Sequence, residues 1–183
     1  GLDAAAAAWL KGQDTVERIE FGRARAAIAR TGRPDLLARA ELHRCALRVA
    51  TLAFGPCAGF EPLAADATPE DAAYARYLAN ALRPGDADRL PAVHRAALGA
   101  ADASTALRGV ADPVTRLVAA GAAFQRGQAS PAVVQLAVDT ASAEGWPRPL
   151  LGWLRVQQEL ARSAGDAAAV ERLQRRIDAV VRP

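Results

Sequence analysis

Several residue types and patterns are scarce or missing in this chain of 183 residues. It contains no methionine, two cysteines, one lysine and 5% aromatic residues. No segment approaches the roughly 18–20 consecutive apolar residues that cross a membrane. The alternation of polar with β-branched or aromatic residues that is typical of strands is also missing. The sequence therefore predicts neither a transmembrane segment nor a β-rich fold.

The missing methionine bears on how the chain was processed. Its first residues, Gly1-Leu2-Asp3, lack the basic segment that opens a signal peptide. A signal peptide or lipoprotein leader that has already been removed would explain a chain without methionine, and so would a trimmed chain. One expectation is therefore an exported protein, periplasmic or attached to the outer membrane by a lipid anchor on the removed N-terminus; the other is a cytoplasmic protein.

The net charge is only +3, and it is unevenly distributed. Residues 1–60 carry 9 basic and 6 acidic groups, residues 61–112 carry 5 and 8, and residues 113–183 carry 9 and 6. Lys11 is the only lysine, a bias that we attribute to genomic base composition. A nucleic-acid footprint would require basic residues clustered on one face, so no nucleic-acid partner is predicted.

The residues that are abundant favour helices. Half of the chain is apolar (51%), and alanine, the strongest helix former, is the commonest residue. Leucine and valine recur at helical spacing and supply the burial. We predict a single all-α domain, with an N-terminal helix pair over 14–54, an irregular acidic middle over 61–111 and further helix pairs over 112–183.

Start and stop signals are clearest in the last third of the chain. A capping residue opens each helix or a proline frames its start, and a glycine closes all but the last, which predicts four helices in succession. The start signals are Asp112-Pro113, Ser130-Pro131, Pro147 with Pro149, and Asp166; the stop signals are Gly127, Gly145 and Gly165. Short turns between such helices predict a stack of antiparallel helix hairpins, either an α-solenoid or an irregular bundle.

Earlier in the chain the same signals predict further helices. Their expected ranges are 3–10, 15–30, 34–54 ending at Gly55-Pro56, 68–82 ending at Pro84-Gly85, one that starts at Asp86 or Asp88 with Pro91 in its first turn, and 102–109. The segment 57–67 reads as a loop.

Two short motifs in the last third resemble the tetratricopeptide repeat. Leu117-x-x-Ala120-Gly121-x-x-Phe124 is similar to the first helix of that repeat, and the segment 164–170 resembles its turn and second-helix start. Gly127 and Gly165 lie 38 residues apart, within the range of helical hairpin repeats. The small and aromatic positions of the second helices are not met. The resemblance covers about 113–182 and implies a superhelical scaffold with a concave face that binds a peptide or protein.

Cys45 and Cys57 are separated by twelve residues, across the predicted end of the long helix. A helix that ends near Ala53 rises about 12 Å beyond Cys45, and three or four returning residues of about 3.3 Å each can cover that distance. A disulfide is thus reachable and would indicate an oxidising compartment. Two unpaired thiols are the alternative. The spacing excludes a CxxC redox pair. No further cysteine or histidine lies at the spacing of zinc ligands, so no metal site is predicted.

No catalytic or cofactor motif is present. His43 falls on the apolar stripe of its helix and His94 at a predicted helix interface, positions typical of hydrogen-bonded core histidines. Cys45 is two residues from His43 and so faces a different sector of the helix, which excludes a Cys–His pair.

We therefore predict a non-enzymatic scaffold that holds a protein or peptide in a groove, without metal or cofactor. The candidate partner-binding residues are His43, Tyr74, Tyr77, Trp146, Trp153 and Arg155. The alternatives are a small-ligand domain or enzyme built around His43 or His94, favoured by a cavity in which a histidine meets a carboxylate or hydroxyl, and a cytoplasmic regulator that reads an acidic partner through its arginines.

Overall fold

The regular structure in the computed structural model, which describes residues 1–182, is entirely helical over that range and confirms the all-α prediction. The α-helices are α1 (Leu2–Leu10), α2 (Asp14–Ala29), α3 (Pro34–Ala50), α4 (Pro69–Leu78), α5 (Ala92–Gly99), α6 (Ala103–Leu107), α7 (Pro113–Gln125), α8 (Pro131–Glu144), α9 (Pro147–Ser163) and α10 (Ala167–Val181). Two short 3₁₀ helices, η1 (Glu61–Asp66) and η2 (Ala87–Arg89), flank α4. No helix in this part of the chain has both the length and the apolarity to cross a membrane.

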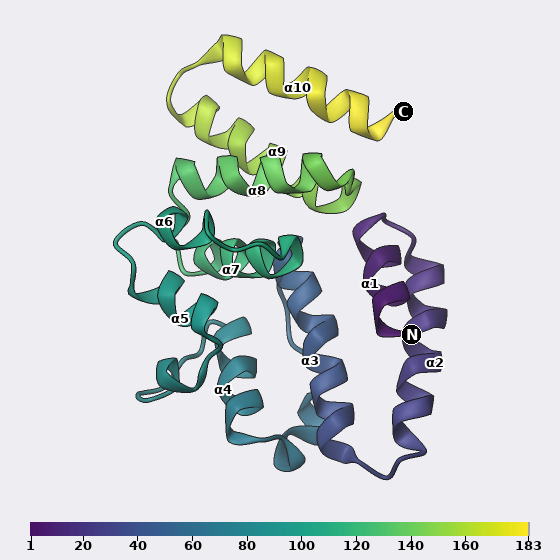
Figure 1. Cartoon of the computed structure of the whole chain (residues 1–183). Coiled ribbons are helices and arrows are strands. Elements are labelled where there is room, and N and C mark those ends of the chain that lie inside the picture. Colours follow the sequence, from purple (N-terminus) through teal and green to yellow (C-terminus); the bar gives the residue numbers. More distant parts are fainter. Residues whose placement is uncertain (183) are drawn as a thin grey trace.

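Helices α7 to α10 form a stack in which each helix packs on the one before it (Figure 1). The predicted caps are in place: the side chains of Asp112, Ser130 and Asp166 accept hydrogen bonds from the backbone N–H three residues later. Gly145 ends α8 with a φ of 65°, a left-handed conformation that favours glycine. Local signals therefore set the bounds of these helices.

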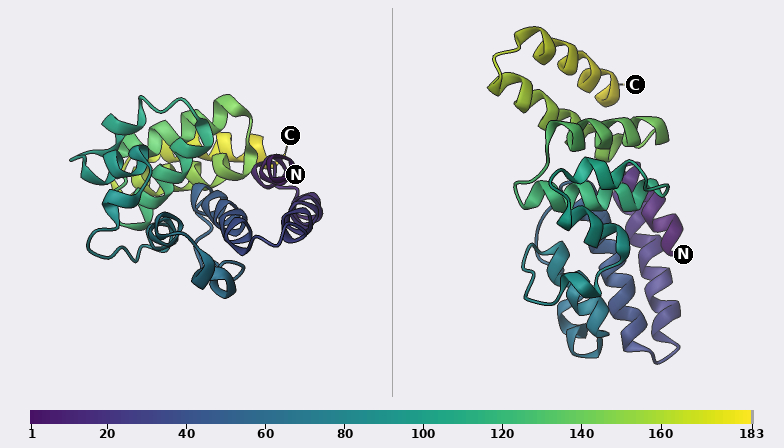
Figure 2. Two further views of the ribbon diagram at one scale, coloured as in Figure 1. Left: turned by 60° about the horizontal axis from the view of Figure 1, so that its bottom comes forward. Right: turned by 60° about the vertical axis from the view of Figure 1, so that its left-hand side comes forward.

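Helices α1, α2 and α3 run crosswise to this stack, as the views in Figures 1 and 2 show. α1 and α2 form a hairpin, and α3 packs against α7 in the stack. Gly121 on α7 lies at the closest approach, because a Cβ added there would stand 2.1 Å from the carbonyl oxygen of Val49. The absence of a side chain at Gly121 allows the two helices to cross.

Helix α3 ends at Ala50, earlier than the predicted end near residue 54. Leu52 adopts a left-handed conformation with a φ of 61°, and the next amide, of Ala53, donates to the carbonyl of Arg48. Indole groups bind two other carbonyls near this end: Trp9 donates to Leu47 and Trp153 to Ala50. Residues distant in sequence thus supply partners for the carbonyls at the end of α3, which the local Gly55-Pro56 signal could not reveal.

Two further boundaries differ from the prediction. α4 ends at Leu78 because Asn80 takes a left-handed conformation with a φ of 54°. The helix expected from Asp86 or Asp88 is divided into η2 and α5, since Leu90 is extended and Pro91 stands before α5. Proline lacks an amide hydrogen, and the residue before it is disfavoured in the helical conformation.

Small residues dominate the contacts around α7. Ala119, Ala123 and Ala137 are fully buried, together with Leu117 and Val138. Alanine at a helix interface allows a close approach while the neighbouring leucine and valine side chains fill the space. The resulting core extends from α3 through the stack to Leu173 and Ile177 on α10.

Candidate binding groove

Two adjoining hollows lie between α1, α3, α4, α5 and α7. Their volumes are about 400 Å³ and about 530 Å³. They share five lining residues, His43, Ala46, Tyr74, His94 and Thr115, and therefore form one groove. We call the first the acidic hollow, which Asp3, Asp112 and Trp146 also line, and the second the mixed-charge hollow, which Arg39, Glu70, Asp71 and Arg89 also line.

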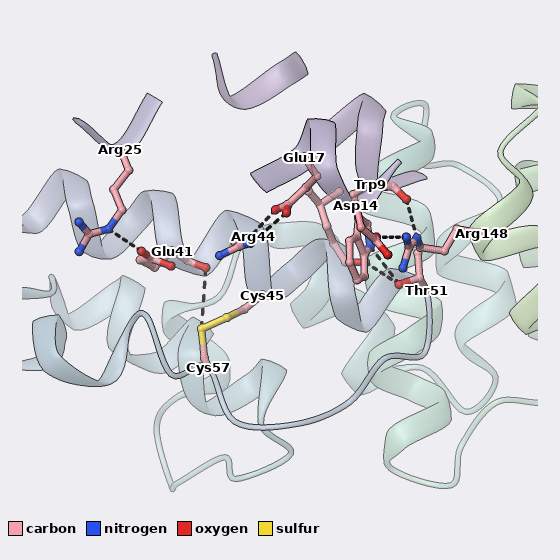
Figure 3. A network of polar contacts seen from close by, with 11 residues as sticks. Trp9, Asp14, Glu17, Arg25, Glu41, Arg44, Cys45, Thr51, Cys57 and Arg148 are labelled. Atoms are coloured by element: carbon pink, nitrogen blue, oxygen red, sulfur yellow. Dashed lines mark hydrogen bonds and ion pairs between the residues drawn. A yellow bond between two sulfur atoms is a disulfide. The ribbon is translucent and has the colours of Figure 1, made fainter. Parts of the chain in front are cut away.

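Helix α1 forms one wall of the acidic hollow and is held by Trp9. The indole Nε1 of Trp9 donates to the carbonyl of Leu47 and to Oγ1 of Thr51, both at 3.2 Å (Figure 3). The guanidinium of Arg148, at the start of α9, stacks 3.8 Å from the centre of the Trp9 ring, and its Nε donates to the Trp9 carbonyl at 2.6 Å. These contacts fix α1 to both α3 and α9, so the wall is preformed.

Helix α3 is held on its other side by polar contacts with α2. Arg44 makes a two-pronged ion pair with the buried Glu17, at 2.6 and 2.9 Å, and its guanidinium lies 4.5 Å from the centre of the Phe21 ring (Figure 3). Arg25 binds Glu41 at 2.8 Å in the same interface. Buried charges of this kind require their partners, so α2 and α3 are held in one register.

The predicted cysteine pair lies at disulfide-bonding distance. Cys45 and Cys57 are bonded through their sulfur atoms, with Cα atoms 5.9 Å apart (Figure 3). The bond holds the segment after α3 against that helix, and Cys57 Sγ lies 3.8 Å from the carbonyl oxygen of Glu41. Gly59 meets the Glu41 carboxylate so closely that an added Cβ would stand 2.1 Å from it.

His94 is a buried, hydrogen-bonded histidine, as the sequence predicts. Its Nδ1 lies 3.0 Å from the hydroxyl of Tyr77, and burial raises the pKa of Tyr77 to about 12. Burial, with a smaller contribution from Arg126, lowers the pKa of His94 to about 4. A protonated Tyr77 hydroxyl can therefore donate to a neutral imidazole at pH 7, and this tyrosine fixes the His94 ring at the edge of the groove.

His43 differs from the expected hydrogen-bonded core histidine. It is half-buried and lines both hollows, and its Nε2 is buried without a hydrogen-bond partner among residues 1–182. Burial lowers the pKa of His43, opposed by the charge of Asp3. The groove is thus lined by a neutral imidazole whose buried Nε2 has no hydrogen-bond partner among residues 1–182. A buried polar atom without a partner is uncommon and indicates a ligand, a water or a functional role.

The other predicted partner-binding residues divide into three groups. Tyr74 and Trp146 are half-buried and line the acidic hollow beside His43. Tyr77 and Trp153 are fully buried, so their assignment to a partner surface is corrected: they are core anchors. Arg155 is exposed on α9 and lines neither hollow.

Sequence reasoning missed Asp3, Asp112 and Thr115 as parts of the groove. Asp3 and Asp112 were each fully explained by helix starts, and the Asp112 carboxylate does cap α7. The crossing of α1 and α7 on α3 brings the two carboxylates to one hollow, and no local signal encodes that crossing. In the described part of the chain, no group of three or more His, Cys, Asp or Glu residues is placed to hold a metal ion.

No protein-family model, curated protein or solved structure matches this chain. The geometry of the groove is therefore the basis for the function proposed below.

Proposed function

We propose that this protein is a helical scaffold that binds a segment of a partner protein in the groove between α1, α3, α4, α5 and α7. The observation that carries the proposal is an open groove lined by His43 together with the half-buried Tyr74 and Trp146. Aromatic side chains with an apolar body and a polar edge are typical of residues that dominate binding energy.

The shape of the groove favours a chain segment as the occupant. Two connected hollows follow one another across α3, and Ala6, Ala7 and Ala46 leave room between the larger side chains. The α1 wall is already fixed by Trp9 and Arg148, so little ordering entropy is lost when a segment binds. The resemblance of α7–α10 to tetratricopeptide repeats remains part of this proposal, with the stack as the support behind the groove.

The proposal is tested by selecting random dodecapeptides on the folded protein and on a variant with a blocked groove. Ala7→Trp places an indole at the exposed edge of the acidic hollow without entering the core. We expect peptides that bind the wild type to lose at least about tenfold in affinity for this variant, because the indole occupies their site. Ala26→Trp, on the exposed face of α2, is the matched control and should bind as the wild type does.

Circular dichroism and thermal unfolding of the three proteins establish that the comparison is between folded chains. Peptides that bind the wild type and Ala7→Trp equally would show that binding occurs elsewhere, and would contradict the groove as the binding site. A selection that yields no groove-dependent peptide would overturn the scaffold proposal.

A second candidate, a small-ligand site or an enzyme built around a histidine, is favoured by one observation. The neutral imidazole of His43 lines both hollows, which places a hydrogen-bonding side chain at the wall of a small-molecule-sized space. His94 is a weaker candidate, because Tyr77 occupies its Nδ1 and its pKa is about 4. A small-molecule library screened by NMR, with His43→Gln as the negative control, separates this candidate from the scaffold.

The proposed location is the bacterial cell envelope, as a periplasmic protein or an outer-membrane lipoprotein, and the bonded cysteine pair supports it. Intact mass after alkylation, with and without reductant, provides the test on protein prepared from cells without a thiol. Uptake of two alkyl groups only after reduction supports the envelope. Alkylation of both thiols in the unreduced protein would contradict the disulfide and favour a cytoplasmic location.

A further inference from the structure

We propose that the acidic hollow receives a lysine or arginine side chain of the bound segment. This inference rests on the proposed function and specifies its partner: the bound segment of the partner protein carries a basic residue at the position that faces Asp3 and Asp112.

The charge of the hollow is the first argument. Asp3 and Asp112 line it, and neither lysine nor arginine does. Across residues 1–182, neither carboxylate takes part in an ion pair. In a chain whose net charge is +3, this leaves a hollow with two exposed carboxylates that no basic side chain of residues 1–182 neutralises. A cation bound between them gains attraction from both.

The mixed-charge hollow provides the contrast. Arg39 binds Asp71 at 3.1 Å there, and Glu70 and Arg89 add one charge of each sign. Its charges therefore balance without a ligand. The same holds at buried acids elsewhere, where Glu17 is bound by Arg44 and Asp86 by Arg76. The two carboxylates of the acidic hollow are thus free to bind a cation from outside the chain.

Asp112 keeps an oxygen for a ligand. Its Oδ2 accepts from the backbone N–H of Thr115 at 2.7 Å and from the Thr115 hydroxyl at 2.6 Å. Within the described residues, Oδ1 makes no hydrogen bond to another side chain or backbone group. The same carboxylate can therefore cap α7 and accept from an ammonium or guanidinium group.

Aromatic and imidazole groups complete the site. Tyr74 and Trp146 line the same hollow, and aromatic faces attract cations. This chain already uses such contacts, with Arg148 on Trp9 at 3.8 Å and Arg44 on Phe21 at 4.5 Å. Burial lowers the pKa of both His43 and His94, so neither adds an opposing charge at pH 7.

The test removes the two charges and keeps the fold. Asp3→Asn with Asp112→Asn replaces both carboxylates by amides, and asparagine caps a helix about as well as aspartate. The control is Glu144→Gln with Glu171→Gln, two exposed positions on α8 and α10 that change the net charge equally. Both pairs are compared with the wild type by fluorescence anisotropy, using peptides from the random selection.

The expected result is a coupling between peptide and protein changes. Peptides selected on the wild type should share a lysine or arginine at one aligned position, and norleucine there should weaken binding about fivefold. In the Asn variant the same exchange should weaken binding about twofold or less, because the cation has lost its partners. In the Gln control the exchange to norleucine should again weaken binding about fivefold.

Each contrary outcome is distinguishable. Groove-dependent peptides without a shared basic residue, or an equal norleucine effect in wild type and Asn variant, overturn this inference and leave the scaffold function standing. If no groove-dependent peptide is recovered, the scaffold function fails, and the site is tested with N-acetyl-lysine methylamide. A saturable shift of the Trp146 indole signal that the norleucine analogue and the Asn variant lack supports the cation site; no shift overturns it.

Discussion

Different interactions hold together the α7–α10 stack and the helices α1 to α5 around the groove, which we call the groove-forming region. In the stack, three of four helices start at a side-chain cap, and the buried contacts are made mainly by alanine, leucine and valine. A few uncharged or singly charged hydrogen bonds, such as Arg116–Thr140 and Gln158–Gln174, join neighbouring helices there. Around the groove, buried ion pairs such as Glu17–Arg44, a disulfide and indole–carbonyl hydrogen bonds connect helices distant in sequence.

This difference indicates where binding is to be expected. Apolar side chains between successive helices pack densely, because small and branched side chains interdigitate. Polar contacts hold α1, α2 and α4 around α3 by a few directed bonds and leave hollows between them. The groove-forming region therefore combines a rigid frame with hollows, and the stack supports it through the α3–α7 contact. Buried polar atoms without a partner occur in both regions of the described chain, at His43 beside the groove and at Gln125, Arg126 and Gln157 in the stack.

The largest effect is expected from Gly121→Ala, which separates the two regions. The added Cβ would stand 2.1 Å from the carbonyl oxygen of Val49, and backbone on both sides must move. We expect a loss of about 3 kcal/mol or more in the free energy of unfolding, measured by urea denaturation. Gly22→Ala is the control, since Gly22 lies inside α2 with open space around it; it should stabilise by up to about 1 kcal/mol. Equal effects at both positions would contradict the close crossing.

Breaking the disulfide tests whether the groove-forming region can loosen alone. The bond closes a loop with a sequence separation of 12, for which the loss of chain entropy in the unfolded state predicts about 3 kcal/mol. Calorimetry with and without reductant should show this loss, and Cys45→Ala with Cys57→Ala should abolish the sensitivity to reductant. Hydrogen exchange should increase first after α3 and last in α8. A uniform increase would mean that the two regions unfold as one.

Acid should destabilise the groove-forming region selectively through His94. Its pKa is about 4 in the folded protein against about 6.5 when unfolded, so below pH 6.5 the unfolded chain binds the proton first. Stability is therefore full above about pH 6.5, falls by about 2–3 kcal/mol as the pH approaches 4, and loses nothing more from this group below that. Urea denaturation across this range should show a larger loss in the wild type than in His94→Gln, where the lowered pKa of His43 still contributes. An equal loss in the two proteins would contradict the role of His94.

The smallest effect is expected at the far end of the stack. Asp166 caps α10, which packs on α9 and presents an exposed outer face. Asp166→Ala should cost about 1 kcal/mol, seen as faster hydrogen exchange in α10 with peptide binding unchanged. Asp166→Asn keeps the cap and is the control. A change in peptide binding would show that the stack is more than a support.

The sequence by itself determined the helices of the stack. Asp112, Ser130 and Asp166 mark starts, and glycines such as Gly145 mark ends, because a cap satisfies backbone groups within three or four residues of itself. These signals act before any neighbour is present, so they can be read without the fold. The prediction that Cys45 and Cys57 can form a disulfide followed from the rise of one helix and the length of one loop.

Only the tertiary structure decided the groove and the partners that the carbonyls at the end of α3 find. The carbonyls of Leu47 and Ala50 find their donors on Trp9 and Trp153, which lie 38 and 103 positions away. The acidic hollow likewise exists because α1 and α7 both pack against α3 and bring Asp3 and Asp112 to one hollow. Hydrogen bonds and charges between distant helices depend on how the helices cross. That crossing is set by packing, to which Gly121 contributes only once Val49 lies against it.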